Sequence, residues 1–472
     1  MQSIFPQDRS FRATVTLVAL ALVSCEGFHF DIPHERLEVS APDSWQAASN
    51  GHHGEISTGW LDEFSDRGMK QAVGEALEHN QDLKTAAARM RQAKHSAIAG
   101  RARLRPSAGV DAAAGYRINE NGRNPADESE NYGLSLAASW EIDLWGRLRD
   151  LTSADEADHA SAQAAYRGAR LSLAANAGKA WCNLITAEHL LELSHETLDS
   201  NSKVLGITER LFKGGAGQGA LDVQLGRTNV AAAGRAVKAA ELARNEAARS
   251  YEVLIGRYPS AESRGSRELP ALKSHVPAGL PASLIERRPD LAEARAEIFA
   301  SAKRADAARK ELLPRLALTG SSGTPVSRFG NFLDPAFLAT SVAANASQSL
   351  YEGGALAANA KAALAANDAT VHAYARTALE AFREVESALN ADASLAEQES
   401  FLLKEVEQAA LAQKQSARDY SDGSNDDILR VLESQTRATN ARGSLIRLRN
   451  QRLQNRIDLH LALGGDFRTE AK

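Results

Sequence analysis

The sequence predicts a mainly α-helical fold with a small β-sheet, built from one structural unit that occurs twice. Residues 82–256 match residues 290–464 without a gap when the chain is shifted by 208 positions. Two long proline-free segments, which follow Gly146 and Gly354, consist mainly of strong helix formers. Short segments in which apolar and polar residues alternate precede them and predict β-strands.

The repeat is carried by residues with special backbone roles rather than by overall identity, as expected for an old internal duplication. The matched pairs include Pro106 with Pro314, Gly146 with Gly354, Gly215 with Gly423, and Gly256 with Gly464. The predicted boundaries are 1–24 for a signal peptide, 25–60 for an anchor arm, 61–256 and 290–464 for the two units, 257–289 for a proline-rich crossover and 465–472 for a tail. The two units are expected to be halves of one body.

The first unit begins with a helical pattern from Trp60 to Leu104, which ends because Arg105 precedes a proline and is restricted to extended conformations. Two strand patterns follow, over 110–116 and 132–142. The second places apolar side chains on one face and small or acidic ones on the other. An ordinary half-buried strand has the same pattern, but a length of about ten residues and aromatic ends favour a membrane barrel.

A predicted helix of about 65 residues then runs from Gly146 to Leu211, a length of roughly 100 Å. A glycine-rich turn ends it, and a second helix returns to Gly256. The second unit repeats this plan after strands over 315–323 and 340–350. Each unit therefore supplies two strands and one long helical hairpin.

Four strands are too few to close a barrel or to protect the edges of the sheet. The chain must therefore pool its strands with copies of itself. Eight strands from a dimer would leave no pore, whereas twelve from a trimer would leave a narrow aqueous one. The predicted fold class is thus a mainly α-helical chain with a small membrane β-barrel, continued by long helices and containing an internal twofold repeat.

Composition and residue spacing favour neither an enzyme nor a nucleic-acid-binding protein. Lys and Arg number 55 against 60 Asp and Glu, a net charge of −5, and no basic stripe occurs. None of the 12 histidines has another histidine three or four positions away, so no helical metal-binding pair is present. The glycines at 214–219 follow a predicted helix rather than a strand, which argues against a phosphate-binding loop. We expect no catalytic site, no metal and no cofactor.

The N-terminus predicts export and lipid attachment. Arg9 and Arg12 precede an apolar segment, 13–23, which has the length of a signal-peptide core rather than of a membrane span. The segment runs into Leu-Val-Ser-Cys, which resembles the bacterial lipobox, so Cys25 is the predicted acylation site and first mature residue. The alternative is an ordinary signal peptide with an incidental cysteine. The other cysteine, Cys182, lies in a helical pattern and is expected to be buried.

A series of short motifs runs through the mature chain in a fixed order. They are Trp60-Leu61-Asp62-Glu63-Phe64, Trp140-Glu141-Ile142-Asp143-Leu144-Trp145-Gly146, Leu254-Ile255-Gly256-Arg257-Tyr258-Pro259, Leu284-Ile285-Glu286-Arg287-Arg288-Pro289-Asp290 and Leu350-Tyr351-Glu352-Gly353-Gly354. Together they resemble the TolC-type outer-membrane factors, specifically the NodT-like lipoprotein branch of RND-type efflux systems. The resemblance covers nearly the whole mature chain.

The resemblance implies a homotrimer, with a 12-strand barrel in the outer membrane and a long α-helical tunnel across the periplasm. It implies two partners, a periplasmic adaptor (membrane fusion protein) and an inner-membrane RND-type pump that supplies the energy. The implied function is a passive efflux channel whose tip opens when the adaptor docks. The alternatives are the outer-membrane duct of a type I secretion system and a non-conducting coiled-coil structural lipoprotein.

In that family a ring of carboxylates narrows the periplasmic tip, and acidic rings favour cations. The residues implied for the aperture are Asp222, Asp426, Asp427, Arg430 and Glu433, and those implied for adaptor contact at the tip turns are Gly215, Gly217, Asp422 and Gly423. Arg430 occupies the position that corresponds to Asp222, which departs from the family pattern and shifts the expected constriction toward Asp426, Asp427 or Glu433. The alternative role for each aspartate is to complement a helix dipole.

Overall fold

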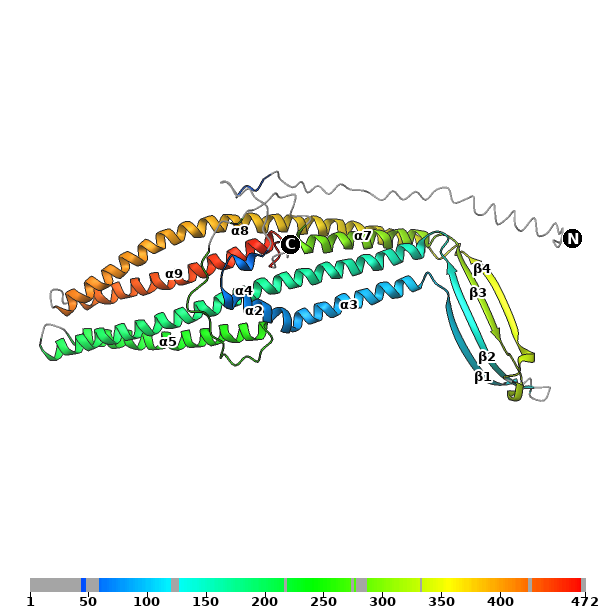
Figure 1. Ribbon diagram of the computed structural model, residues 1–472, viewed down its shortest axis with the longest axis horizontal. Coiled ribbons are helices and arrows are strands. Elements are labelled where there is room, and N and C mark those ends of the chain that lie inside the picture. Colours follow the sequence, from blue (N-terminus) through cyan, green and yellow to red (C-terminus); the bar gives the residue numbers. More distant parts are fainter. Residues whose placement is uncertain are drawn as a thin grey trace. The chain divides into compact units, whose positions relative to one another are not determined.

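The computed structural model describes residues 44–47, 59–119, 127–215, 219–272, 276, 287–331, 333–422 and 427–467, all within the compact unit Val39–Lys472. Figure 1 shows that helices make up most of the described chain and that its extended strands form one four-stranded sheet. The prediction of a mainly helical chain with four strands is confirmed. Within the described residues, no helix is both long and apolar enough to cross a membrane.

The helices of the two units coincide when the chain is shifted by 208 residues. Helix α3 (Gln81–Ala102) corresponds to α7 (Pro289–Lys310), α4 (Arg147–Lys213) to α8 (Ala355–Ser421), and α5 (Ala220–Leu254) to α9 (Ile428–Ala462). Helices α4 and α8 both contain 67 residues, and α5 and α9 both contain 35. The internal repeat and its two long hairpins are therefore present as predicted.

The first predicted helix is divided into three shorter helical elements. Between Trp60 and Leu104 the chain forms a short 3-10 helix, η1 (Trp60–Asp62), and then α2 (Arg67–His79) and α3. The break lies at Asn80, whose backbone is extended and whose side chain accepts a hydrogen bond from the Leu83 N–H at 3.0 Å. An asparagine in this position caps the N-terminus of a helix, so α3 starts afresh where the sequence pattern predicted continuity.

The four strands form an antiparallel sheet in the order β1-β2-β3-β4, with β1 (Ser107–Asn119), β2 (Asp127–Ile142), β3 (Arg315–Gly323) and β4 (Ala339–Ser347). Strand β4 is shorter than the predicted 340–350. The reason is that Ser347 pairs with Arg315, the first residue of β3, so no partner strand remains beyond it.

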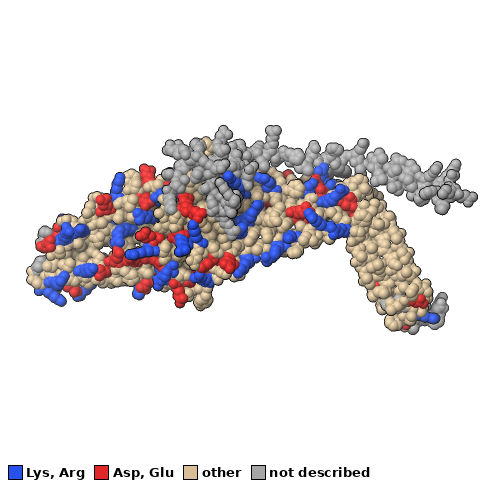
Figure 2. Space-filling model, viewed as in Figure 1, with Lys and Arg blue, Asp and Glu red and all other residues tan. Residues whose placement is uncertain are grey.

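The register gives the sheet two chemically different faces. Odd-numbered residues share one face in all four strands, as in the row Ser107, Ser139, Thr319 and Ala343, and we call it the polar face. Even-numbered residues form the apolar face, which exposes its large side chains. Those side chains include Val110, Leu136 and Val342, which are 70%, 54% and 75% exposed. Figure 2 shows few charged side chains over the strands, in contrast to the helices.

The helices pack side by side, with α4 at the centre. Helix α4 contacts α3, α5, α7 and α9, and α8 contacts α7 and α9. One hydrophobic core joins η1, α2 and the middle of α4 to α5 and α9, and a second lies between α7, α8 and α9. Cys182 is completely buried in the first core, as expected.

A buried network of charged groups fastens η1 and the residue after it to α8 and α9. Glu63 lies 2.6 Å from Arg456 Nη1 and 2.6 Å from His460 Nε2, and Arg456 Nη2 lies 3.1 Å from both carboxylate oxygens of Asp392. The His460 ring stacks on Trp60, with centroids 6.0 Å apart. Burial raises the pKa of Glu63, but the hydrogen bonds and charges of His460 and Arg456 outweigh burial and lower it.

Candidate functional site at the tips of the helical hairpins

Two of the predicted aperture carboxylates hold the first turns of the returning helices. The Asp222 carboxylate accepts a hydrogen bond from the Gly219 N–H at 2.8 Å, at the start of α5. The Asp427 carboxylate accepts one from the Leu429 N–H at 2.9 Å, as the N-cap of α9. Both side chains therefore complement a helix N-terminus, which is the alternative role considered for them.

Arg430 and Glu433 lie on the first turns of α9 and are exposed. Arg430 Nε is 3.5 Å from the Asp427 carboxylate, and Glu433 accepts a hydrogen bond from Arg437 at 2.6 Å. The second hairpin tip thus carries basic side chains next to its acidic ones. The position in the first hairpin that corresponds to Arg430 is Asp222, so the two tips carry opposite charges at this position.

Some of the predicted turn residues can be placed. Gly215, two residues after the end of α4, has a positive φ of 73°, a conformation that favours glycine. Asp422 is the C-cap of α8, and its N–H donates to the Arg418 carbonyl at 2.9 Å. Gly217, Gly423 and Asp426 lie outside the described residues.

The structure adds a contact that the sequence analysis missed. The Tyr420 hydroxyl and Thr208 Oγ1 lie 2.8 Å apart, and the two residues are only 1% and 0% exposed. This hydrogen bond joins α8 to α4 close to both turns, within a small core that also contains Ile428 and Val431. Burial raises the pKa of Tyr420, the Thr208 hydrogen bond offsets part of the rise, and the Asp222 charge adds to it.

A signal for this contact exists in the repeat. The 208-residue shift aligns Tyr420 with Phe212, which has no hydroxyl and is 45% exposed. Tyr420 therefore differs from its counterpart in two ways, since it has a hydroxyl and is buried. Such a difference between two copies of one unit indicates a contact that only the second copy makes. The sequence alone could not show that Thr208 was the partner, because the two residues come from different units.

Polar contacts continue between α4 and α9 above the tips. The Gln435 side chain donates to Ser200 at 2.9 Å, and Arg442 donates to Glu196 at 2.7 Å. Thr197 and Thr439 lie 3.4 Å apart. The Arg442 and Glu196 side chains are 46% and 48% exposed, and ion pairs between exposed side chains are individually weak. This part of the seam therefore resists separation of the two helices only weakly.

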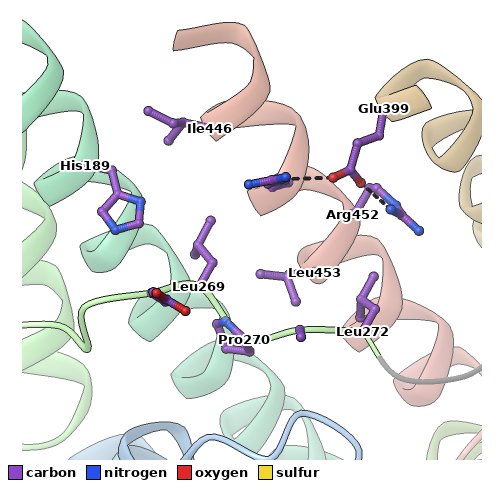
Figure 3. Close-up of a pocket in the computed structure, with 11 residues that line it drawn as sticks. His189, Leu269, Pro270, Leu272, Glu399, Ile446, Arg452 and Leu453 are labelled. Carbon is purple, nitrogen blue, oxygen red and sulfur yellow. Dashed lines mark hydrogen bonds and ion pairs between the residues drawn. The ribbon is translucent and has the colours of Figure 1, made fainter. Parts of the chain in front are cut away.

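A cavity of about 630 Å³ lies farther from the tips, between the crossover segment at 268–272 and helices α4, α8 and α9. Figure 3 shows Glu399 held between two arginines, and the distance to Arg449 Nε is 2.9 Å. Burial raises the pKa of Glu399, but hydrogen bonds and charges from Arg452 and Arg449 lower it below its usual value. Both arginines that line the cavity are therefore paired with Glu399.

Comparisons with known proteins agree with this architecture. The family model "Outer membrane efflux protein" matches the chain twice, over residues 72–257 and 280–465. The two matches are related by the same 208-residue shift as the helices, and together they cover most of the 472 residues.

Individual relatives match over nearly their full length. The chain is 29% identical to outer membrane protein OprJ of Pseudomonas aeruginosa over 474 residues, covering 97% of this chain and 96% of OprJ. It is 28% identical over 451 residues to the pyoverdine export outer membrane protein OpmQ of the same species, with 92% of each chain covered. The open-state structure of the Neisseria gonorrhoeae outer membrane channel MtrE aligns with a TM-score of 0.81 and 25% identity, covering 93% of this chain and 98% of MtrE. The chain therefore belongs to the outer membrane efflux protein family, and it is an outer-membrane efflux channel rather than an enzyme.

Proposed function

We propose that three copies of the chain form one channel, with a 12-strand barrel and a helical tunnel below it. The two open edges of the four-stranded sheet carry this proposal. Among the described strands β1 pairs only with β2, and β4 pairs only with β3, so within the described residues each copy has two edge strands. Such edges need a partner, most of all in lipid, where no water can replace the missing hydrogen bonds. Pairing β4 of one copy with β1 of the next satisfies every edge.

The channel works with a periplasmic adaptor and an inner-membrane RND-type pump. A passive duct supplies no energy, so transport against a gradient must be driven by another protein. The tip turns at Gly215, Gly217, Asp422 and Gly423 are the surfaces that the adaptor contacts in this proposal. A duct of a type I secretion system would use the same turns with a different pump.

Gating separates the two hairpins at their tips. The Tyr420–Thr208 hydrogen bond and the polar seam between α4 and α9 hold the closed arrangement, and both support this proposal. The constriction itself is formed by Asp222, Asp426, Asp427, Arg430 and Glu433 from the three copies. Opening exposes Tyr420, whose burial is otherwise complete.

The mature chain begins at an acylated Cys25 and is anchored in the same membrane as the strands. Trp45 packs edge-on against Phe382 of α8, and the N–H groups of Gln46 and its neighbour donate to Glu386 at 2.8 Å. About 20 residues separate Cys25 from Trp45, which can span up to roughly 66 Å. Phe382 lies about 27 residues along α8, or roughly 40 Å from its start beside the sheet. The arm is therefore long enough to return to the membrane.

The deciding experiment combines the mass of the detergent-purified protein with its ion conductance in planar bilayers. We expect a trimer that conducts. A stable monomer or dimer would contradict the trimer, and a trimer that never conducts would favour a coiled-coil structural lipoprotein. Crosslinking in cells, followed by identification of the bound adaptor and pump, distinguishes an RND-type system from type I secretion.

Cys25→Ser tests the anchor separately. We expect it to abolish labelling of the protein by radioactive palmitate while the protein still assembles. Unchanged labelling would contradict the assignment of Cys25. The matched control is Cys182→Ser, because Cys182 is buried and should have no part in acylation.

A further inference from the structure

The polar face of the sheet is hollow and lined by small side chains. A cavity of about 370 Å³ lies on the sheet, and most of its lining residues are odd-numbered, among them Ser107, Gly109, Ser139, Thr319, Ser321 and Ser341. A hollow on this face, opposite the large side chains of the apolar face, fits the inner wall of a barrel. The polar face would then line the water-filled lumen.

Asp111 is a charged exception in the middle of this face. Its row contains Ser135, Gly323 and Ala339, none of which carries a charge. The Asp111 side chain is exposed and makes no hydrogen bond or ion pair with any described residue. Its charge is therefore not neutralised within the described part of one copy.

The other charged side chains described on the polar face are paired or distant. Glu141 lies 2.7 Å from Arg147, and Arg315 lies 3.5 Å from Glu311, both at the end of the sheet next to the helices. Arg117 is six residues farther along β1, about 20 Å away in an extended strand. Asp111 is thus the dominant charge in the central rows.

We propose that Asp111 gives the membrane-spanning part of the channel a preference for cations. The inference rests on the proposed trimer, in which three Asp111 carboxylates face one lumen. Twelve strands about 4.8 Å apart and tilted by about 40° give a backbone radius of roughly 12 Å. The carboxylates then lie within about one Debye length, ~10 Å at 0.1 M salt, of the pore axis. Their potential reaches the axis in dilute salt and is screened at 1 M.

The test measures the local potential with charged thiol reagents on the full-length protein in lipid vesicles. Ala113→Cys places a thiol on the polar face, about 7 Å from Asp111 along the strand. The rate at which the thiol at position 113 reacts is measured with a cationic and with an anionic methanethiosulfonate. Each rate is divided by the rate of the same reagent with a free thiol in solution, and the ratio of the two normalised rates is taken. We expect this normalised ratio to favour the cationic reagent at least threefold in 0.1 M salt. Adding Asp111→Asn, or raising the salt to 1 M, should bring it close to one.

Two controls separate this inference from the proposed pore. Ala112→Cys lies on the apolar face and should react slowly with both reagents. Glu130→Gln also removes one negative charge from the sheet, but from the apolar side, and should leave the ratio at position 113 unchanged. Cys182 does not interfere, because burial raises its pKa to about 12.

Each contrary result has a distinct meaning. If the thiol at position 113 reacts quickly but Asp111→Asn leaves the ratio unchanged, the role of Asp111 is refuted while the pore stands. If the thiol at position 112 reacts and that at 113 does not, the faces are reversed, and both the inference and the barrel arrangement are wrong.

Discussion

Tyr420 and Thr208 share a buried 2.8 Å hydrogen bond between α8 and α4, close to the hairpin turns. Thr208 also donates to the Val204 carbonyl at 3.0 Å, so its hydroxyl keeps a partner if Tyr420 is changed. The contact can therefore be weakened without leaving an unsatisfied group behind.

Tyr420→Phe should favour the open channel. Loss of one neutral hydrogen bond costs about 1 kcal/mol. The three copies of the proposed trimer give about 3 kcal/mol, which shifts the ratio of open to closed channels roughly a hundredfold. Single-channel recording should show a higher open probability. The matched control is Phe212→Tyr, which adds a hydroxyl at the corresponding exposed position and should change little. Equal open probability in Tyr420→Phe and wild type would place the closing contact elsewhere.

Asp427→Asn separates the two roles of that carboxylate. Asparagine caps a helix about as well as aspartate, so the start of α9 should stay intact. The charge that we propose for the aperture is lost, and block of the channel by trivalent cations should weaken several-fold. Asp427→Ala removes the cap as well and should lower the unfolding free energy by about 1 kcal/mol. Unchanged cation block in both variants would limit Asp427 to capping.

Glu63→Gln should destabilise the protein at neutral pH and matter less in acid. Breaking a buried ion pair costs about 3 kcal/mol. The folded-state pKa of Glu63 lies below its usual 4.5, so its contribution is present above pH 4.5 and is lost as the pH falls through the folded-state value. Thermal melts should show a difference from wild type at pH 7 that narrows below pH 4.5. Glu246→Gln, at a 70% exposed side chain, should show almost none. A difference that does not change with pH would contradict the shifted pKa.

Gly256→Ala should destabilise the end of α5. Gly256 has a φ of 78°, and an added Cβ would lie 2.8 Å from the His79 carbonyl oxygen. We expect a loss of more than about 1 kcal/mol in unfolding free energy. Gly234→Ala is the control, because that helical glycine has open space around it, and alanine there should stabilise by up to about 1 kcal/mol. Equal effects of the two substitutions would contradict this explanation.

The long helices, the strands and the repeat could be predicted because each leaves a periodic or positional signal. Proline-free segments marked α4 and α8, and alternation marked β2. The break at Asn80 escaped prediction because α2 and α3 continue one apolar pattern and only a single capping hydrogen bond separates them. The helix propensities of the residues do not show that the backbone is extended at this one position.

The tip was harder to predict than the fold. Family resemblance directed attention to the acidic residues after the turns, and Asp222 and Asp427 do lie there. The Tyr420–Thr208 contact depends on how two units pack against each other, which no periodicity within one unit encodes. The alternation in β1 places Asp111 on the polar face. Only the register of all four strands shows that no other charged residue lies in its row.

The equal lengths of α4 and α8, and of α5 and α9, restrict how this protein can change over evolution. One residue inserted into a single long helix would advance its tip by about 1.5 Å and rotate every later side chain by about 100°. Neighbouring walls would then end at different heights and present different faces to each other. A viable lengthening must therefore occur in both hairpins, and in steps close to seven residues that restore the helical phase. Because the two hairpins must lengthen together, the tunnel can extend across the periplasm only in steps of about seven residues.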